Sequence, residues 1–160
     1  MARRVTPLVF LSLVLCASAL SAGEMVPFRG HWEGSTISAD FIAPDVVLVV
    51  ASGTGNATEL GAFQMTSPHL TYLATFIVTG QHNFTAANGD TLNAEFTGQL
   101  LPNAGGNLEG TLDATITGGT GRFAGATGSY AFHIVARPAA FGFDSTADFT
   151  GSISSVGTNP

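Results

Sequence analysis

Strict alternation of apolar and polar side chains is the feature that most restricts the fold of this chain. Between residues 91 and 99, apolar or small residues alternate with Thr, Asn, Glu and Gln. The same two-residue period recurs over 108–117, 129–134 and 143–153, and no stretch after residue 27 has a convincing helical period. Because successive side chains of a strand point to opposite faces, each run predicts a strand with one apolar and one threonine-rich face.

Turn-forming residues separate these runs. They lie at Ala43–Asp45, Ser52–Asn56, Ser67–Pro68, Asn88–Asp90, Pro102–Gly106 and Gly118–Gly119. The strands between them are predicted over 28–39, 45–52, 57–66, 70–86, 91–101, 108–117, 126–137 and 143–154. Short connections favour antiparallel neighbours, and a single apolar face favours a barrel over an immunoglobulin-like sandwich. We therefore expect an all-β protein, a single eight-stranded antiparallel β-barrel whose interior is filled by side chains or holds one small ligand.

Alternation alone does not say which face of the strands lies inside the barrel. An outer-membrane barrel would turn its apolar face outward, with interfacial girdles rich in Tyr and Trp. The chain has only two Tyr and one Trp. We therefore expect a soluble barrel with an apolar interior, and the outer-membrane barrel remains the alternative.

The first 22 residues have the three parts of a secretory signal peptide. Arg3 and Arg4 precede an apolar run over 8–15, and small residues follow over 17–22. The apolar run is shorter than the roughly 20 residues that a membrane-spanning helix needs. The sequence predicts a signal peptide over 1–22, a barrel domain over 23–154 and a C-terminal tail over 155–160. The signal peptide predicts a secreted or periplasmic protein that has no membrane span after cleavage.

Composition narrows the classes of function that are open to the chain. Its only cysteine, Cys16, lies in the predicted signal peptide, so the mature protein would have no disulfide and no cysteine nucleophile. The formal charge of the whole chain is −6, and removal of Arg3 and Arg4 leaves three Arg against eleven acids, or −8. A chain without a basic face does not bind nucleic acid through its phosphates.

A glycine-rich run between two predicted strands is the most distinctive motif. Residues 116–128 read ITGGTGRFAGATG. Its glycines suit a tight crossover at a barrel end, where Phe123 would plug the apolar interior and Arg122 would bond carbonyls or an acidic neighbour. The residues predicted to build this motif are Gly118, Gly119, Gly121, Arg122, Phe123 and Gly125.

This run resembles the G-G-[ST]-G-x-F-x-G-A-x-G signature of allene oxide cyclases, plant dirigent proteins and bacterial secreted proteins with the same barrel. The resemblance implies an eight-stranded barrel, often trimeric, with an apolar cavity. In that superfamily the cavity steers the cyclisation or radical coupling of a reactive hydrophobic substrate. The catalytic residues of the cyclases and of the dirigent proteins have no counterparts that can be matched here position by position.

The apolar faces of the predicted strands supply the candidate ligand-binding residues. They are Trp32, Phe76, Val78, His82, Phe84, Phe96, Tyr130 and Phe132. His82 shares its face with Phe76, Val78 and Phe84, so it is either a proton shuttle in an apolar cavity or a satisfied core histidine.

His31 and Glu33 are the other candidate catalytic residues. They are two residues apart and so share one face of the first predicted strand. The pair could act as an acid and a base, could bind a metal as two of its ligands, or could belong to an ordinary solvated surface. A third ligand would have to come from His69, His82 or His133, and no spacing favours one of them. We expect no metal and no cofactor.

These observations favour one function and leave a second open. We expect an exported barrel of the allene-oxide-cyclase-like or dirigent-like type that binds a small hydrophobic molecule, with guidance of its cyclisation or isomerisation as an open question. The alternative is a non-enzymatic extracellular binding or structural module with a solid core. The resemblance adds a homo-oligomer, dimer or trimer, to the expected partners.

Overall fold

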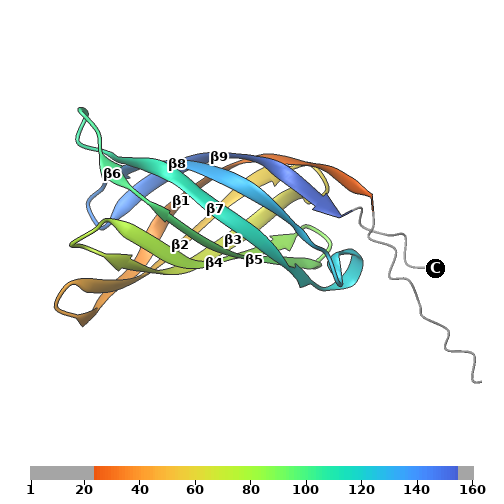
Figure 1. Ribbon diagram of the computed structural model, residues 1–160, viewed down its shortest axis with the longest axis horizontal. Helices are drawn as coiled ribbons and strands as arrows, with labels where there is room; N and C mark the ends of the chain where they lie inside the picture. Colours follow the sequence, from red (N-terminus) through yellow and green to blue (C-terminus); the bar gives the residue numbers. More distant parts are fainter. Residues whose placement is uncertain (1–23, 155–160) are drawn as a thin grey trace, which may run out of the picture.

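Nine strands and one short 3-10 turn follow one another along residues 24–154, the part of the chain that this computed structural model describes (Figure 1). They are β1 (Met25–Ala43), β2 (Val46–Ala57), β3 (Gly61–Tyr72), β4 (Ile77–Ala86), β5 (Thr91–Gln99), β6 (Leu101–Pro102), β7 (Leu108–Gly119), η1 (Gly121–Phe123), β8 (Gly128–Pro138) and β9 (Phe143–Ser154).

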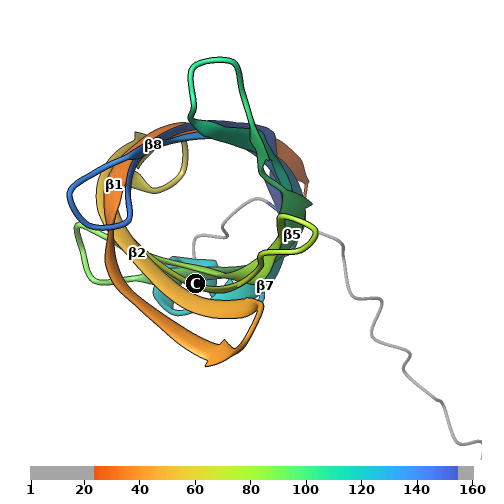
Figure 2. The same cartoon turned by 90° about the vertical axis from the view of Figure 1, so that its left-hand side faces the viewer.

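The strands pair with their neighbours in sequence until the sheet closes on itself. The order is β5-β4-β3-β2-β1-β9-β8-β7, and β5 also pairs with β7, so eight strands form a complete ring. Every pairing is antiparallel. The two-residue β6 only extends the hairpin between β5 and β7. Figure 2 looks along the axis of this ring. The predicted eight-stranded antiparallel barrel is confirmed.

The apolar face of the strands lies inside the barrel. In β5, Leu92, Ala94 and Phe96 are buried, whereas Glu95 and Thr97, which alternate with them, are exposed. The same alternation holds along β7, where Leu112, Ala114 and Ile116 are buried. The expected inward orientation is therefore confirmed for these strands. No helix within residues 24–154 is long and apolar enough to cross a membrane.

The hairpins divide the barrel into two ends. The end that carries the β2–β3, β4–β5 and β7–β8 connections, with η1, is called the closed end here. The end that carries the β1–β2, β3–β4, β5–β7 and β8–β9 connections is called the mouth. The mouth lies at the left of Figure 1 and faces the viewer in Figure 2.

The predicted turn at Ser52–Asn56 is wrong, because these residues lie within β2. Gly53 pairs with Gly34 of β1. A Cβ atom at Gly53 would lie 2.0 Å from the Glu33 carbonyl oxygen, and one at Gly55 would lie 2.2 Å from the His31 carbonyl oxygen. Glycine is needed at both positions because the two backbones approach closely, not because the chain turns.

The predicted turn at Ser67–Pro68 and the predicted strand over 70–86 are also wrong. Pro68 lies within β3, where the pairing with β4 is interrupted between Thr66–Asn83 and His69–Gly80 and so tolerates a residue without an N–H. The true turn falls at residues 73–76, inside the predicted strand. Phe76 ends that turn with a φ of 56°, a left-handed conformation that the sequence does not announce.

Several predictions fall on residues outside the described part of the chain. The signal peptide over 1–22, Cys16 and the tail over 155–160 all lie there, and they remain predictions.

A methyl group added at Gly53 should destabilise the barrel. Gly53→Ala would force β1 and β2 apart, and we expect a loss of about 1–3 kcal/mol in unfolding free energy, measured by urea denaturation. Gly105→Ala is the matched control, because its Cβ would lie 3.3 Å from the nearest atom, the Asn103 side chain, in an exposed loop. Equal stability of the two variants would contradict the close-approach explanation.

Candidate ligand-binding site

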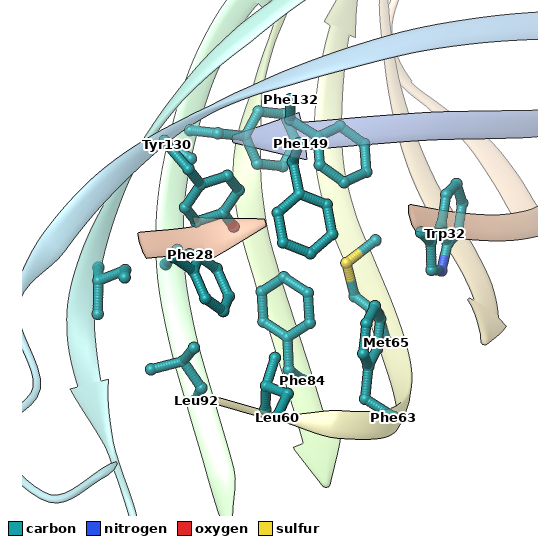
Figure 3. Packing of buried hydrophobic residues seen from close by; sticks show 14 of the residues in the cluster. Phe28, Trp32, Leu60, Phe63, Met65, Phe84, Leu92, Tyr130, Phe132 and Phe149 are labelled. Carbon is teal, nitrogen blue, oxygen red and sulfur yellow. The ribbon is translucent and has the colours of Figure 1, made fainter. Parts of the chain in front are cut away.

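The closed end of the barrel is filled by aromatic side chains. The rings of Phe28, Phe84, Phe149 and Tyr130 pack with centroid separations of 5.2–6.4 Å (Figure 3). All four are at most 3% exposed. At that separation aromatic rings are in contact, so this half of the interior has no room for a ligand.

The mouth half of the interior is hollow. A cavity of about 420 Å³ opens there, and its wall is almost entirely apolar. Much of the wall consists of small or β-branched residues, among them Ala39, Val47, Val49, Ala51 and Thr71. The volume lies in the range of small-molecule binding sites. The barrel is therefore neither solid throughout nor empty throughout.

The floor of the cavity carries a buried histidine. His82 is 1% exposed, lines the cavity and stacks on Phe96 at 4.3 Å between centroids. Its Nδ1 lies 2.8 Å from the hydroxyl oxygen of Tyr130. Burial lowers the pKa of His82 to about 3, with a smaller contribution from the nearby His69. Burial also raises the pKa of Tyr130. Both groups are therefore neutral at ordinary pH.

Strand β3 places two more polar residues beside His82, which belongs to β4. His69 and Ser67 both line the cavity, and the register of β3 with β4 places Ser67 opposite His82. The Nδ1–H of His69 donates to the Ser67 carbonyl oxygen at 2.9 Å, which leaves its Nε2 as an acceptor. Burial lowers the pKa of His69, so it too is uncharged. Ser67, His69 and His82 are called the polar strip below.

Trp32 is the opposite case, a buried donor without an acceptor. It is 1% exposed, lines the cavity and packs 6.1 Å from Phe132. In the described part of the chain, its Nε1 is the only fully buried side-chain nitrogen or oxygen with no hydrogen-bond partner. Gly34 makes room for the ring, since a Cβ there would lie 2.2 Å from Trp32. As the only tryptophan of the chain, Trp32 is a fluorescent reporter of the cavity.

The predicted ligand-binding residues fall into two groups. Six of them line the cavity: Trp32, Phe76, Val78, His82, Phe96 and Phe132. Phe84 and Tyr130 belong to the aromatic packing of the closed end. Sequence reasoning missed Ser67, which it assigned to a turn, and gave His69 no role beyond a metal ligand. Their two-residue spacing on one strand was the available signal.

His31 and Glu33 lie on the outer surface of β1, away from the cavity. The two ring nitrogens of His31 lie 2.8 Å from Asp148 and 3.2 Å from Glu33. The bond to Asp148 raises the pKa of His31 most, and the bond to Glu33 adds to it. Cross-strand pairing of β1 with β9 brings Asp148 to this site. The described residues contain no cluster of three or more His, Cys, Asp or Glu that could hold a metal ion.

The glycine-rich motif lies at the closed end, far from the mouth. Gly121 has a φ of 55° and sits against Asp90, where a Cβ would clash. Phe123 is fully buried in the core. The Arg122 guanidinium donates to the Leu60 carbonyl at 3.3 Å and lies 3.9 Å from Asp90. This arrangement seals the closed end and takes no part in the cavity.

An apolar collar surrounds the mouth. It consists of large hydrophobic side chains that are exposed at the hairpins and strand ends of the mouth: Ile37, Phe41, Ile42, Leu48, Leu73, Phe76, Ile77, Leu101 and Phe141. Phe41, near the tip of the β1–β2 hairpin, is 71% exposed. Phe76 belongs to the collar and to the cavity wall, so the two apolar surfaces are continuous.

Comparisons with known proteins give a structural likeness only. No family model matches the sequence, and a search of curated proteins finds no match. Among solved structures, the protein is similar to the pterocarpan synthase dirigent protein GePTS1, with a TM-score of 0.48 and 11% identity. The match covers 91% of this chain and 98% of that chain. The case for a function therefore rests on the cavity.

Acid should weaken the wild-type protein more than a variant without His82. In the unfolded state the His82 imidazole takes up a proton near pH 6.5, whereas in the folded state it stays neutral down to about pH 3. Stability is therefore lost as the pH falls through this window. Between pH 7.5 and 4.5 we expect the wild type to lose about 3 kcal/mol of unfolding free energy relative to His82→Phe. Parallel pH profiles in urea denaturation would contradict a buried, neutral His82.

Proposed function

We propose that the protein is an exported barrel that binds a small hydrophobic molecule in its interior. The observation that carries this proposal is the apolar cavity of about 420 Å³ at the mouth. Packed protein interiors leave few voids larger than a water molecule, so an apolar hollow of this size is not ordinary core. The collar around the mouth offers an entering molecule a continuous apolar path.

The division of the barrel into two halves favours binding over the solid-core alternative. The closed end carries the densest aromatic packing, and the mouth half is left hollow. Larger side chains at positions 49 and 51 would fill the cavity, yet the chain carries Val49 and Ala51 there. A purely structural module gains nothing from such a hollow, because each unfilled volume costs stability.

A second candidate function is the guided cyclisation or isomerisation of the bound molecule. The specific observation in its favour is His82 at the cavity floor, hydrogen-bonded through Nδ1 to Tyr130 behind it, since an imidazole can relay a proton between its two nitrogens. Confinement and orientation would supply most of the rate effect. His82→Phe should then lower turnover of the molecule recovered from the protein without unfolding the barrel, and unchanged turnover would remove His82 from this function.

Native mass spectrometry of residues 23–160, purified from the exported fraction without detergent, tests the binding function. We expect a discrete small-molecule adduct on a dimer or a trimer. The recovered molecule should also quench Trp32 fluorescence on rebinding, because Trp32 forms part of the cavity wall. Protein without an adduct that also fails to bind the apolar reporter N-phenyl-1-naphthylamine would overturn the proposal in favour of a structural module.

A side chain that fills the cavity should abolish binding. Ala51→Phe places a ring into the hollow, and we expect loss of the adduct and of saturable reporter binding while the barrel stays folded. Ala62→Phe is the matched control, because Ala62 is exposed at the start of β3 and does not line this cavity. Equal binding by the two variants would place the ligand elsewhere.

A further inference from the structure

The polar strip brings two imidazoles and a hydroxyl to the floor of a mostly apolar cavity, and it indicates the class of ligand. This inference rests on the proposed binding function and goes beyond it, from the existence of a ligand to its chemistry. Apart from Trp32 and Tyr130, Ser67 and His82 are the only buried residues with a polar side chain in the described chain. Both line the cavity, Ser67 from β3 and His82 from the adjacent strand β4.

The hydrogen bond between His82 and Tyr130 determines which proton faces the cavity. Tyr130 does not line the cavity, so the Nδ1 of His82 points away from it. If Nδ1–H were the donor, the buried phenol proton of Tyr130 would have no acceptor among the aromatic rings around it. A buried donor without an acceptor is costly, so Tyr130 donates to Nδ1 and the proton of the neutral imidazole sits on Nε2.

The Nε2 of His82 borders the open space of the cavity. Within residues 24–154 it has no hydrogen-bond partner, and it is not a fully buried orphan either, since Trp32 holds the only such atom there. The same two facts hold for the Ser67 hydroxyl. The cavity floor therefore offers an uncompensated N–H donor, with a hydroxyl on the facing strand.

The charges around this donor exclude an anionic ligand. The chain has no lysine, and none of its described arginines, Arg29, Arg122 and Arg137, lines the cavity. His69 and His82 both lie neutral in the wall. A carboxylate at the floor would be buried without a counter-charge, which is far more costly than burying a neutral oxygen with one hydrogen bond.

We propose that the ligand is an uncharged, mostly apolar molecule whose hydroxyl or carbonyl oxygen accepts a hydrogen bond from the Nε2–H of His82. The oxygen enters first and reaches the floor. The apolar remainder lies against Val49, Phe76 and Phe132 and extends toward the mouth. A hydroxyl ligand can in turn donate to the bare Nε2 of His69 or to Ser67.

Competition between matched ligands tests the inference. N-phenyl-1-naphthylamine is bound to the wild-type protein at pH 8 and displaced by decan-1-ol, decan-2-one or decanoate. We expect the alcohol and the ketone to bind at least about tenfold more tightly than the ionised acid. Decanoate that competes as well as decan-1-ol would overturn the inference. Failure of the wild type to bind the reporter, in protein that also carries no adduct, would overturn the proposed function itself, which is a different outcome.

Two variants of His82 test the donor. In His82→Phe, affinity for decan-1-ol should fall about three- to tenfold relative to affinity for the reporter. His82→Gln retains an N–H donor and should keep the preference for the alcohol, and it serves as well if the phenylalanine variant does not fold. His133→Phe is the matched control, because it makes the same change on the exposed outer face of β8. An unchanged ratio in a folded His82→Phe would remove His82 from recognition.

Discussion

The closed ring of backbone hydrogen bonds is the constraint on which the rest of the structure depends. In the described residues it is not supported by any disulfide, and the ion pairs lie at partly exposed surface positions. In a closed barrel, the number of strands together with their tilt and stagger fixes the width of the interior. Eight strands leave room for one layer of inward side chains. The sizes of those side chains then decide whether each level of the barrel is solid or hollow.

The size of the inward side chains changes along the barrel axis within single strands. Strand β1 carries Phe28 in the aromatic packing of the closed end, and Trp32 and Ala39 on the cavity wall. Strand β4 carries Phe84 in the aromatic packing and Val78 on the cavity wall, with His82 between them. The histidine therefore sits at the boundary between the two levels. Its Tyr130 bond belongs to the packed half, and its free nitrogen belongs to the hollow half.

The sequence was sufficient for the architecture because alternation survives even where single turns are misassigned. Eight strands, their antiparallel pairing and the inward face of β5 and β7 all follow from the two-residue period. Pro68 was one source of error, and glycine was another. At Gly53 it permits close approach of two strands, at Gly121 it permits a left-handed turn, and the local sequence does not distinguish these uses. The turn that ends at Phe76 has no glycine or proline at all.

The site was less accessible than the fold for a physical reason. Alternation says which side chains point inward, and it does not say how far along the axis each one lies. Phe84 and Phe96 have the same inward pattern, yet only Phe96 lines the cavity. Depth depends on the register between strands. The position of Ser67 opposite His82 became visible only once the register of β3 with β4 was known.

Closure of the barrel also determines when the first strand can complete its pairing, because its partner is the last strand. The first strand pairs along one edge with the last, from Met25 opposite Ser154 to Ser35 opposite Asp144. A chain that emerges with its N-terminus first, from a ribosome or from a translocation channel, cannot complete this ladder until residue 154 is free. Contacts of such long sequence range form slowly. The barrel is therefore held open during synthesis by its own connectivity, and its ring of strands closes only when residue 154 has been released.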